Sequence, residues 1–192
     1  MKLIVGLGNP GEQYRKTRHN AGRFLLESLA AHLKVRFQKS KIAEYTAAIV
    51  DSKDEKTILA YPDCFMNVSG PVVKKLVDDF SIDFKKDFLI LVDDVALTLG
   101  RLRLKSKGSD GGHNGLKSVQ EALGSLEYAR LKLGIGPSDA TAIPFLRDYV
   151  LSEFPSDERK ALEEMVKRGL KACTVWLEQP IEKAMNAVNV YK

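Results

Sequence analysis

Three histidines supply all of the imidazole groups in the chain, and imidazole is the side chain that most readily takes up a proton near neutral pH. His32 falls within a segment of helical apolar spacing, so we expect it on the surface or at its boundary. His19 lies in a polar loop just before a predicted helix, and His113 lies in the glycine-rich stretch GGHNG. From the residues alone, either of these two could be a catalytic base.

Two carboxylates directly follow the apolar run Phe88–Val92. We expect this run to be a buried strand, so Asp93 and Asp94 stand at its exit, where open α/β sheets place their sites. A carboxylate in that position can hold an imidazole in one tautomer and stabilise its protonated form. A histidine–carboxylate pair that activates water is therefore the simplest chemistry that these residues offer.

Two asparagines are candidate ligand-binding residues. Asn9 follows the first predicted strand, on a tight turn that aims its amide out of the carboxyl end of the sheet, where α/β proteins bind ligands. Asn67 stands before a predicted helix in CFMNVSG, where helix capping is the ordinary explanation for an asparagine.

The glycines of the first turn, Gly6, Gly8 and Gly11, spell G-x-G-x-x-G, the pattern of a dinucleotide-binding loop. That loop needs a helix that opens on the glycines and an acidic residue after a second strand, about 20 residues later. Here Pro10 and a polar stretch delay the helix, and Glu27 falls inside it. A tight strand-exit turn explains the glycines better, and we expect no nicotinamide cofactor.

Three other chemistries fit less well. A metal site could use Asp93, Asp94 and a histidine, but the chain lacks H-x-x-x-H or clustered ligand spacing. Cys64 could form a nucleophilic triad with His19 and Asp93, but nothing around it marks an elbow or a lowered thiol pKa, and a buried structural cysteine is the ordinary interpretation. No G-x-S-x-G elbow indicates a serine enzyme.

These side chains need a scaffold that brings distant segments together, and hydrophobic periodicity predicts its elements. We expect strands at Lys2–Gly8, Thr46–Asp51, Thr57–Tyr61, Phe88–Val92, Leu99–Lys105 and Leu131–Ile135. We expect helices at Asn20–Leu33, Ser69–Phe80, Leu116–Leu123, Ser156–Leu177 and Ile181–Val188. Strands that alternate with helices predict an α/β fold, with a mixed, largely parallel twisted sheet flanked by helices on both faces, in a single domain over residues 1–192.

Some local details follow from turn and cap signals. The two β-rich runs on either side of SKDEK predict a hairpin. Ser69 is the expected N-cap of its helix, with Pro71 in the first turn. Two segments are candidates for flexibility, Ser106–Gly112 and Gly136–Ala142, and the first could act as a mobile lid beside the site.

Composition limits the class of protein. The 192 residues are 44% hydrophobic and 29% charged, which fits one globular domain with a sizeable core and excludes a disordered chain. The net charge of +5 weakly favours a polyanionic partner such as nucleic acid. Cys64 and Cys173 are too few for a disulfide framework. With no signal peptide and no apolar stretch near the roughly 20 residues of a membrane span, we expect a cytoplasmic protein.

Four segments resemble those of the bacterial peptidyl-tRNA hydrolases. They are GLGNPGEQYRKTRHNAG, FMNVSG, GSDGGHNGLKS and RLKLGIG, in the same order along essentially the whole chain. The resemblance implies a monomeric enzyme, without metal or cofactor, that hydrolyses the ester between a peptide and the tRNA 3′ ribose. Such an enzyme recycles the tRNA that stalled ribosomes release.

The resemblance also implies roles for the chemical groups of the site. His19 is the expected general base that activates water, and Asp93 pairs with it. Asn9 is expected to distinguish peptidyl from free aminoacyl substrates. His113 is expected to add a second imidazole near the cleft and to take part in binding the substrate. A carboxylate-supported imidazole is a suitable base for ester hydrolysis.

Four further residues are implied to contact the substrate. Asn67 and Asn114 are expected to hold it near the ester, and Tyr14 and Phe65 to line the tRNA end. Side-chain amides can donate hydrogen bonds to a developing oxyanion, which is worth about 10²-fold or more in rate for each donor.

A run of basic residues follows the acidic pair Asp93 and Asp94 in the sequence. Arg101, Arg103, Lys105 and Lys107 occupy every second position, so a strand would place them on one face. A solvated edge strand explains this pattern equally well by itself. Beside the SDGGHNG segment, we interpret the run as a phosphate-binding surface for tRNA.

Two positions depart from the family pattern. The stretch DDVALTLG is less acidic than usual after the strand-end carboxylate, which leaves open whether Asp93 or Asp94 supports His19, although spacing to Gly100 favours Asp93. Lys132 stands where the family commonly has arginine. Lysine cannot make the same forked contact, so we expect a weaker grip on phosphate and no loss of activity.

A non-catalytic RNA-binding relative that kept the fold is the competing interpretation. An idle scaffold has no need of the complete catalytic set, which is Asn9, His19, Asn67, Asp93 and Asn114. The presence of all five therefore favours the hydrolase.

Overall fold

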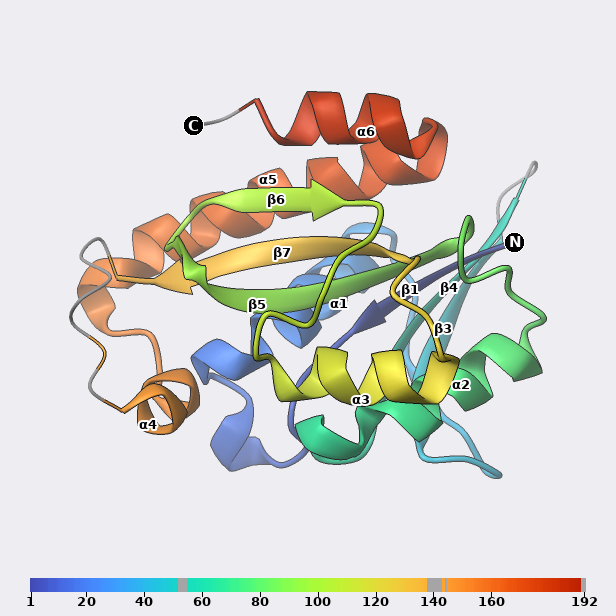
Figure 1. Ribbon diagram of the computed structural model, residues 1–192, viewed down its shortest axis with the longest axis horizontal. Helices are drawn as coiled ribbons and strands as arrows, with labels where there is room; N and C mark the ends of the chain where they lie inside the picture. Colours follow the sequence, from blue (N-terminus) through green and yellow to red (C-terminus); the bar gives the residue numbers. More distant parts are fainter. Residues whose placement is uncertain (52–54, 138–142, 144, 191–192) are drawn as a thin grey trace.

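One sheet joins all the strands of the described chain. The computed structural model describes residues 1–51, 55–137, 143 and 145–190. The strands are β1 (Lys2–Gly6), β2 (Gln38–Lys39), β3 (Tyr45–Asp51), β4 (Lys56–Pro62), β5 (Phe88–Thr98), β6 (Leu102–Lys105) and β7 (Ala129–Gly136). Across these residues they form a seven-stranded sheet in the order β2-β3-β4-β1-β5-β7-β6 (Figure 1).

The sheet is mixed and largely parallel, as predicted. β4, β1, β5 and β7 run parallel to one another in its middle. β3 and β6 are antiparallel to their neighbours, and β2 is antiparallel to β3, so β2 runs in the same direction as the central strands. Because the central strands are parallel, their carboxyl ends meet at one edge of the sheet, where a site can form.

The helices cover both faces, which also confirms the prediction. They are α1 (Ala21–His32), α2 (Ser69–Asp79), α3 (Asn114–Leu123), α4 (Leu146–Leu151), α5 (Arg159–Glu178) and α6 (Ile181–Val188). Short 3-10 helices are η1 (Glu12–Tyr14), η2 (Arg18–Asn20), η3 (Met66–Val68) and η5 (Ser156–Glu158). In Figure 1, α2 and α3 lie together on one side of the sheet and α5 and α6 on the other.

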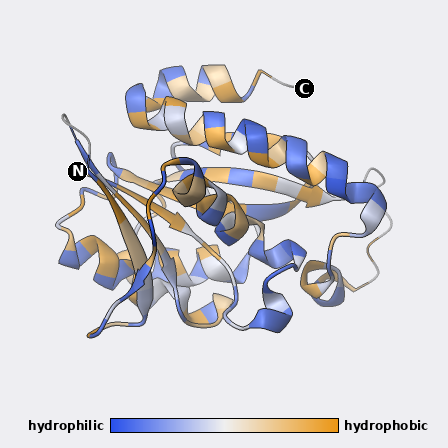
Figure 2. Cartoon of the chain, turned by 180° about the vertical axis from the view of Figure 1, so that it is seen from behind, coloured by the Kyte–Doolittle hydropathy of each residue, from blue (hydrophilic) through white to orange (hydrophobic). Residues whose placement is uncertain are grey.

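Successive side chains of a strand point to opposite faces of the sheet, and a hydrophobic core lies on each face. In β1, Leu3 and Val5 pack toward α2 and α3, while Ile4 packs toward α1 and α5. Figure 2 shows apolar colour along the central strands and mixed colour on the helices, whose polar sides face outward. This is the pattern of a sheet buried on both faces, where a strand reads as a near-continuous apolar run.

Two details around α2 differ from the sequence prediction. The helix begins at Ser69, so Val68 holds the N-cap position and no side chain caps the helix. Ser69 is therefore not the N-cap, and Asn67 does not cap the helix either. The physical reason is that η3 leads directly into α2, so the chain enters the helix from a helical turn.

The strand that carries the acidic pair is longer than predicted. β5 continues through Asp93 and Asp94 to Thr98, with a register shift against β7 between Asp94 and Thr98. Its pairing with β1 ends at Gly6 and Leu91. The two carboxylates thus lie beyond the end of β1, at the sheet edge that was predicted, although they are inside a strand. β6 is correspondingly shorter than predicted and starts at Leu102.

The remaining elements agree with or add to the prediction. β3 and β4 form the predicted antiparallel pair, and residues 52–54 between them lie outside the described part of the chain. The sequence did not predict β2 or α4. All strands belong to one sheet, which agrees with the single domain that we continue to propose for residues 1–192.

None of the helices in the described part of the chain combines the length and the apolar character needed to cross a membrane.

Candidate active site

A cavity of about 670 Å³ opens at the carboxyl edge of the central strands. Nine of the predicted site residues line it: Asn9, Tyr14, His19, Phe65, Asn67, Asp93, His113, Asn114 and Lys132. α4, which the sequence did not predict, forms part of the wall through Leu146 and Val150. The four residues of the predicted basic run lie outside this lining, and two of them, Arg103 and Lys105, belong to β6.

The segment that carries His19 is tied to the end of β1. The backbone N–H of Asn9 donates to Asn20 Oδ1 at 2.9 Å, and Asn20 Nδ2 donates back to the Asn9 carbonyl at 2.9 Å. Next to it, a Cβ on Gly22 would lie 2.2 Å from the carbonyl oxygen of Leu91. Only glycine allows α1 to approach β5 this closely, and this approach brings His19 to Asp93.

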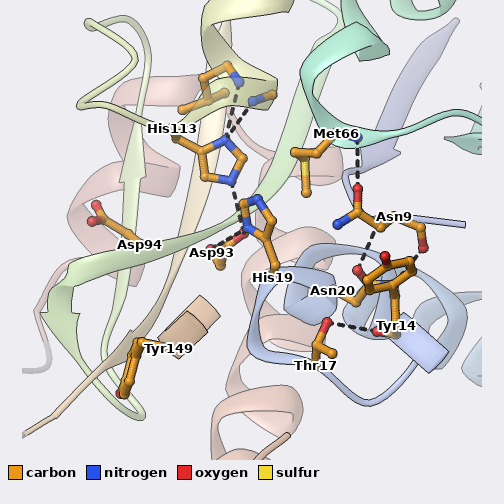
Figure 3. A network of polar contacts seen from close by, with 12 residues as sticks. Asn9, Tyr14, Thr17, His19, Asn20, Met66, Asp93, Asp94, His113 and Tyr149 are labelled. Carbon is orange, nitrogen blue, oxygen red and sulfur yellow. Dashed lines mark hydrogen bonds and ion pairs between the residues drawn. The ribbon is translucent and has the colours of Figure 1, made fainter. Parts of the chain in front are cut away.

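His19 is bonded to Asp93 through one ring nitrogen. Nδ1 lies 3.0 Å from both carboxylate oxygens (Figure 3). An ionised carboxylate can only accept, so Nδ1 carries the proton and Nε2 keeps its lone pair. Among the described residues, Nε2 of His19 has no hydrogen-bond partner. It is therefore free to accept a proton from a molecule in the cavity.

His113 bonds to the same carboxylate from the other side. Its Nε2 lies 2.9 Å from Asp93 Oδ1, and its ring centre lies 4.8 Å from that of His19. Its Nδ1 accepts the backbone N–H groups of Gly115 and Leu116, at 3.1 and 3.3 Å, and so caps α3. Both ring nitrogens of His113 are thus used inside the protein.

His19 and Asp93 shift each other's proton affinity. Burial by itself lowers the pKa of His19, but the charge of Asp93 and its hydrogen bond raise it more, so the net pKa lies above the ordinary 6.5. Burial raises the pKa of Asp93, yet attraction to His113 and His19 and their hydrogen bonds outweigh burial. The net pKa of Asp93 is well below its usual range, so the carboxylate stays ionised.

The side-chain amide of Asn9 is fixed by the start of η3. Its Oδ1 accepts the backbone N–H of Met66 at 2.8 Å, and Asn9 is 7% exposed. In Figure 3 its Nδ2 points toward His19, and no hydrogen-bond acceptor for it is found in the described chain. Asn67 and Asn114 are exposed and line the same cavity. Three amide groups can therefore face one bound molecule.

Two aromatic side chains form the rim on the side of η1. Tyr14 and Phe65 meet edge to face, with ring centres 6.2 Å apart and planes at 84°. Phe65 is 54% exposed, so most of this ring is open for contact. Exposed aromatic faces are suited to stacking on nucleic-acid bases.

The second carboxylate of the acidic pair has a different partner. Asp94 Oδ2 lies 2.8 Å from Lys132 Nζ, and both side chains are largely buried. The structure therefore brings Asp93, and not Asp94, to His19. It also places Lys132 in an ion pair within the cavity wall, opposite Arg103 in the register of β6 and β7.

The basic side chains of β6 share a face with the cavity wall. Arg103 pairs with Lys132 and Lys105 with Arg130, and residues directly opposite on two strands lie on the same face. Leu104, which lies between Arg103 and Lys105 in the sequence, is buried in the hydrophobic core on the other face of the sheet. Arg103 and Lys105 thus extend the sheet face on which Lys132 lines the cavity.

The sequence did not single out Arg18, which supports the site from outside the cavity lining. It directly precedes His19 and is 4% exposed. Its guanidinium lies between the rings of Tyr149 and Phe154, with its Cζ 4.4 and 4.9 Å from their centres, and pairs with Glu158 at 2.7 Å. A lone arginine in a polar loop gives no sequence signal of such burial.

The contacts of Arg18 join η2 to α4 and its flanks. Its backbone N–H donates to the Ser152 carbonyl at 3.0 Å, and Nη1 reaches the Ile135 carbonyl at 3.5 Å. Tyr149 donates its hydroxyl to the same Ile135 carbonyl at 2.6 Å. The wall formed by α4 and the turn that carries His19 are therefore one connected unit.

The glycine-rich segment that was predicted as a mobile lid has several internal anchors. The carbonyl of Gly108 accepts Gln120 Nε2 at 3.2 Å, and that of Ser109 accepts Nη1 of the buried Arg130 at 3.1 Å. Asp110 accepts the Gly112 N–H at 2.8 Å. The role as a lid stays a prediction. The other flexible candidate, Gly136–Ala142, lies mostly outside the described residues.

The structure bears on the alternative chemistries. His19, Asp93 and His113 offer possible metal ligands, with their ligand atoms within 4.8 Å of one another. The two ring nitrogens that face the carboxylate are protonated and hydrogen-bonded to it, so a metal ion bound between them would have to displace those protons.

Cys64 does not line the cavity, and burial together with the charge of Glu44 raises the pKa of its thiol to about 11. A thiol of that kind is a poor nucleophile.

The glycine turn is not followed at once by an α-helix. η1 and η2 separate Gly11 from α1, which begins at Ala21. A Cβ on Gly6 would lie 2.8 Å from the Gly22 carbonyl oxygen. Gly6 therefore serves the contact between β1 and α1, as the strand-exit explanation predicts.

Comparison with known proteins gives one consistent result. The family model described as Peptidyl-tRNA hydrolase matches residues 3–192. A peptidyl-tRNA hydrolase of Desulfitobacterium hafniense is 44% identical over 98% of this chain and 100% of its own length, and one of Oceanobacillus iheyensis is 41% identical with the same coverage. A crystal structure of peptidyl-tRNA hydrolase from Acinetobacter baumannii superposes with a TM-score of 0.90 at 30% identity, covering 100% of this chain and 96% of that chain. The resemblance of the four sequence segments is thereby confirmed.

We expect Arg18→Met to lower the free energy of unfolding by about 2 kcal/mol, because methionine can pack between the two rings but leaves Glu158 without its cation. Arg15→Met is the matched control, because the Arg15 side chain is 63% exposed and its one ion pair among the described residues is with the exposed Glu12. Urea unfolding at pH 7 measures both. Equal stability of the two variants would contradict the structural role of Arg18.

Proposed function

The chain belongs to the peptidyl-tRNA hydrolase family and is an enzyme of that class, and we propose that it cleaves the ester between peptide and tRNA 3′ ribose with His19 as the general base. The observation that carries the mechanism is the bond from His19 Nδ1 to the buried Asp93. That bond leaves Nε2 of His19 with a lone pair on the cavity side.

The proposed reaction begins with a water molecule bound beside His19. Nε2 removes a proton from this water while the water oxygen attacks the ester carbonyl carbon. Asp93 stabilises the imidazolium that forms, through its charge and its hydrogen bond to Nδ1. As the tetrahedral intermediate collapses, the bond from carbon to the ribose oxygen breaks, and the proton on Nε2 passes to that oxygen. The products are free tRNA and a peptide carboxylic acid, which loses its remaining proton to solvent and leaves as the carboxylate.

Amide groups supply hydrogen bonds to the substrate in this proposal. Nδ2 of Asn9 is held in place by the bond from Met66 N–H to its Oδ1, so it is a preorganised donor. Its position supports a contact with the peptide that a free aminoacyl group would lack. Asn67 and Asn114 line the same cavity, and we propose that they hold the substrate near the ester.

The tRNA end is proposed to follow the rim of the cavity. Phe65, which is exposed, and Tyr14, which is partly exposed, present aromatic surface for the terminal bases. Arg103 and Lys105, with Lys132, offer positive charge for phosphates on the adjoining sheet face. Because Lys132 is already paired with Asp94, we expect it to contribute less to phosphate binding than an unpaired arginine would.

The competing interpretation is an RNA-binding relative without catalysis. The full catalytic set lines one cavity with a carboxylate-bound histidine, which disfavours it. We further propose a monomer that acts in the cytoplasm without metal or cofactor. The thiols of Cys64 and Cys173 form no disulfide, which supports a reducing compartment such as the cytoplasm, and sedimentation would measure the oligomeric state.

We expect His19→Ala to abolish release of tRNA from an N-blocked aminoacyl-tRNA while tRNA binding persists. The reason is that the base is lost and the binding surface is kept. Release by the unchanged chain should be the same with and without excess EDTA. Normal turnover by the variant would exclude His19 as the base, and loss of release in EDTA would assign a metal to the site.

The pH dependence should follow the protonation of His19. Only the neutral imidazole can act as base, so kcat/KM should rise with pH through an apparent pKa above 6.5. In Asp93→Asn, the negative charge that raises the pKa of His19 is lost, while the burial that lowers this pKa remains. The inflection of the pH profile should therefore move to lower pH, and the plateau of kcat/KM should fall by on the order of 10²-fold or more. A pH–rate profile of both proteins tests this, and an inflection that stays in place would argue against the pairing.

We expect Arg103→Ala combined with Lys105→Ala to raise KM and to flatten its dependence on salt, by roughly one to two units of logarithmic slope, because two phosphate contacts are lost. Lys85→Ala with Lys86→Ala is the matched control, since these residues precede β5 at the opposite end of the strands. The measurement is KM at several salt concentrations. An unchanged slope in the first pair would remove β6 from the tRNA footprint.

A further inference from the structure

Both ring nitrogens of His113 are engaged within the protein, although the residue lines the cavity (Figure 3). Nδ1 lies 3.1 Å from the N–H of Gly115 and 3.3 Å from that of Leu116. Nε2 lies 2.9 Å from Asp93 Oδ1. A residue that serves the substrate directly would keep at least one of these atoms free.

These contacts fix the tautomer of His113. Backbone N–H groups can only donate, so Nδ1 must hold a lone pair. The single proton of the neutral ring is then on Nε2, where it is donated to the ionised carboxylate of Asp93. In this arrangement His113 has no lone pair left to accept a proton from water and no second proton to give.

We propose that His113 is a positioning residue, which holds the Asp93 carboxylate against His19 and neither binds the substrate nor transfers a proton in the reaction. This inference rests on the proposed role of His19 as general base. It assigns His113 a function through Asp93, in place of the contact with the substrate that the family resemblance implied.

The carboxylate has a specific need for such a residue. Asp93 is 4% exposed, and both of its oxygens lie 3.0 Å from His19 Nδ1. The bond from His113 to Oδ1 restricts rotation of the carboxylate and fixes the line along which Nδ1–H of His19 points. His113 is a firm support because its ring is bonded to the first turn of α3 and its own N–H donates to the Asp110 carbonyl at 3.1 Å.

The second consequence is electrostatic. Asp93 divides its hydrogen bonding between two imidazoles, and a carboxylate that accepts from one donor is a weaker acceptor for another. Loss of the His113 donor should therefore strengthen the hold of Asp93 on the protonated form of His19. The apparent pKa for activity should move to higher pH, opposite in direction to the effect of Asp93→Asn.

Other titratable or charged groups also line the cavity around His19 and stay constant in every variant at position 113. They are Tyr14 from η1, Asp94 from β5, Asp110 from the glycine-rich loop, Lys132 from β7 and Arg147 next to the start of α4. A shift that appears on substitution of His113 alone is therefore assigned to the bond with Asp93.

Two amide substitutions separate the two hydrogen-bonding functions of the ring. His113→Asn places an oxygen near the position of Nδ1 and can still cap α3, but it has no atom that reaches Asp93. His113→Gln can place an amide N–H near the position of Nε2 and donate to Asp93, but it gives a poorer cap. His113→Ala loses both functions.

We expect the Asn variant to keep the melting temperature of the unchanged protein, to lose about tenfold in kcat at constant KM, and to show its pH inflection at higher pH. We expect the Gln variant to melt at lower temperature but to restore kcat and the inflection. The Ala variant should show both defects. A change in KM alone, or an Asn variant with normal kcat and inflection, would overturn the proposal.

A measurement without substrate separates this inference from the proposed function. The chain has three histidines, so NMR can follow the Cε1–H resonance of His19 against pH after assignment with His32→Gln. The titration of His19 should move to higher pH in the Asn variant, even if the hydrolysis assay fails. An unchanged His19 titration in that variant would overturn the inference, whatever the activity of the enzyme.

Discussion

The site depends on one buried carboxylate, that of Asp93, held between two imidazole rings. A buried charge is costly unless it is fully hydrogen-bonded, and this one receives donors from His19 and His113. Those donors come from the turn before α1 and the cap of α3, and Asp93 itself comes from the middle of β5. Three segments that are distant in the chain must therefore meet within about the length of a hydrogen bond, and this requirement constrains the surrounding fold.

Several contacts that take no part in the proposed reaction hold these segments together. The reciprocal bonds between Asn9 and Asn20 close the loop after β1 onto the start of α1, and Gly22 allows α1 to touch β5. Arg18 locks the same turn to the α4 side of the cavity. Each of these contacts is short and internal, so the geometry at His19 is fixed before any substrate binds, as a preorganised site requires.

The charges around the cavity are separated by function. Asp93 is buried and hydrogen-bonded to two imidazoles, and the charge of Asp94 is compensated by Lys132, so neither carboxylate is left exposed and unpaired toward an incoming polyanion. The cationic side chains of β6 lie on the adjoining sheet face. In the proposed function, this arrangement lets one edge of the sheet attract phosphates while the base is kept in a small, shielded network.

The sequence by itself determined the fold class, most of the elements and the identity of the family, because apolar periodicity and the glycine and asparagine motifs are local signals. It also brought His19, Asp93, Asn9 and the other cavity residues into one hypothesis. It did not predict α4, the length of β5, the burial of Arg18 or the tautomer of His113. Those features depend on contacts between residues far apart in the chain, such as Arg18 with Glu158 and His113 with Asp93. Only the tertiary structure decides them, because neighbours in space, and not neighbours in sequence, set the burial and hydrogen bonding of a polar group.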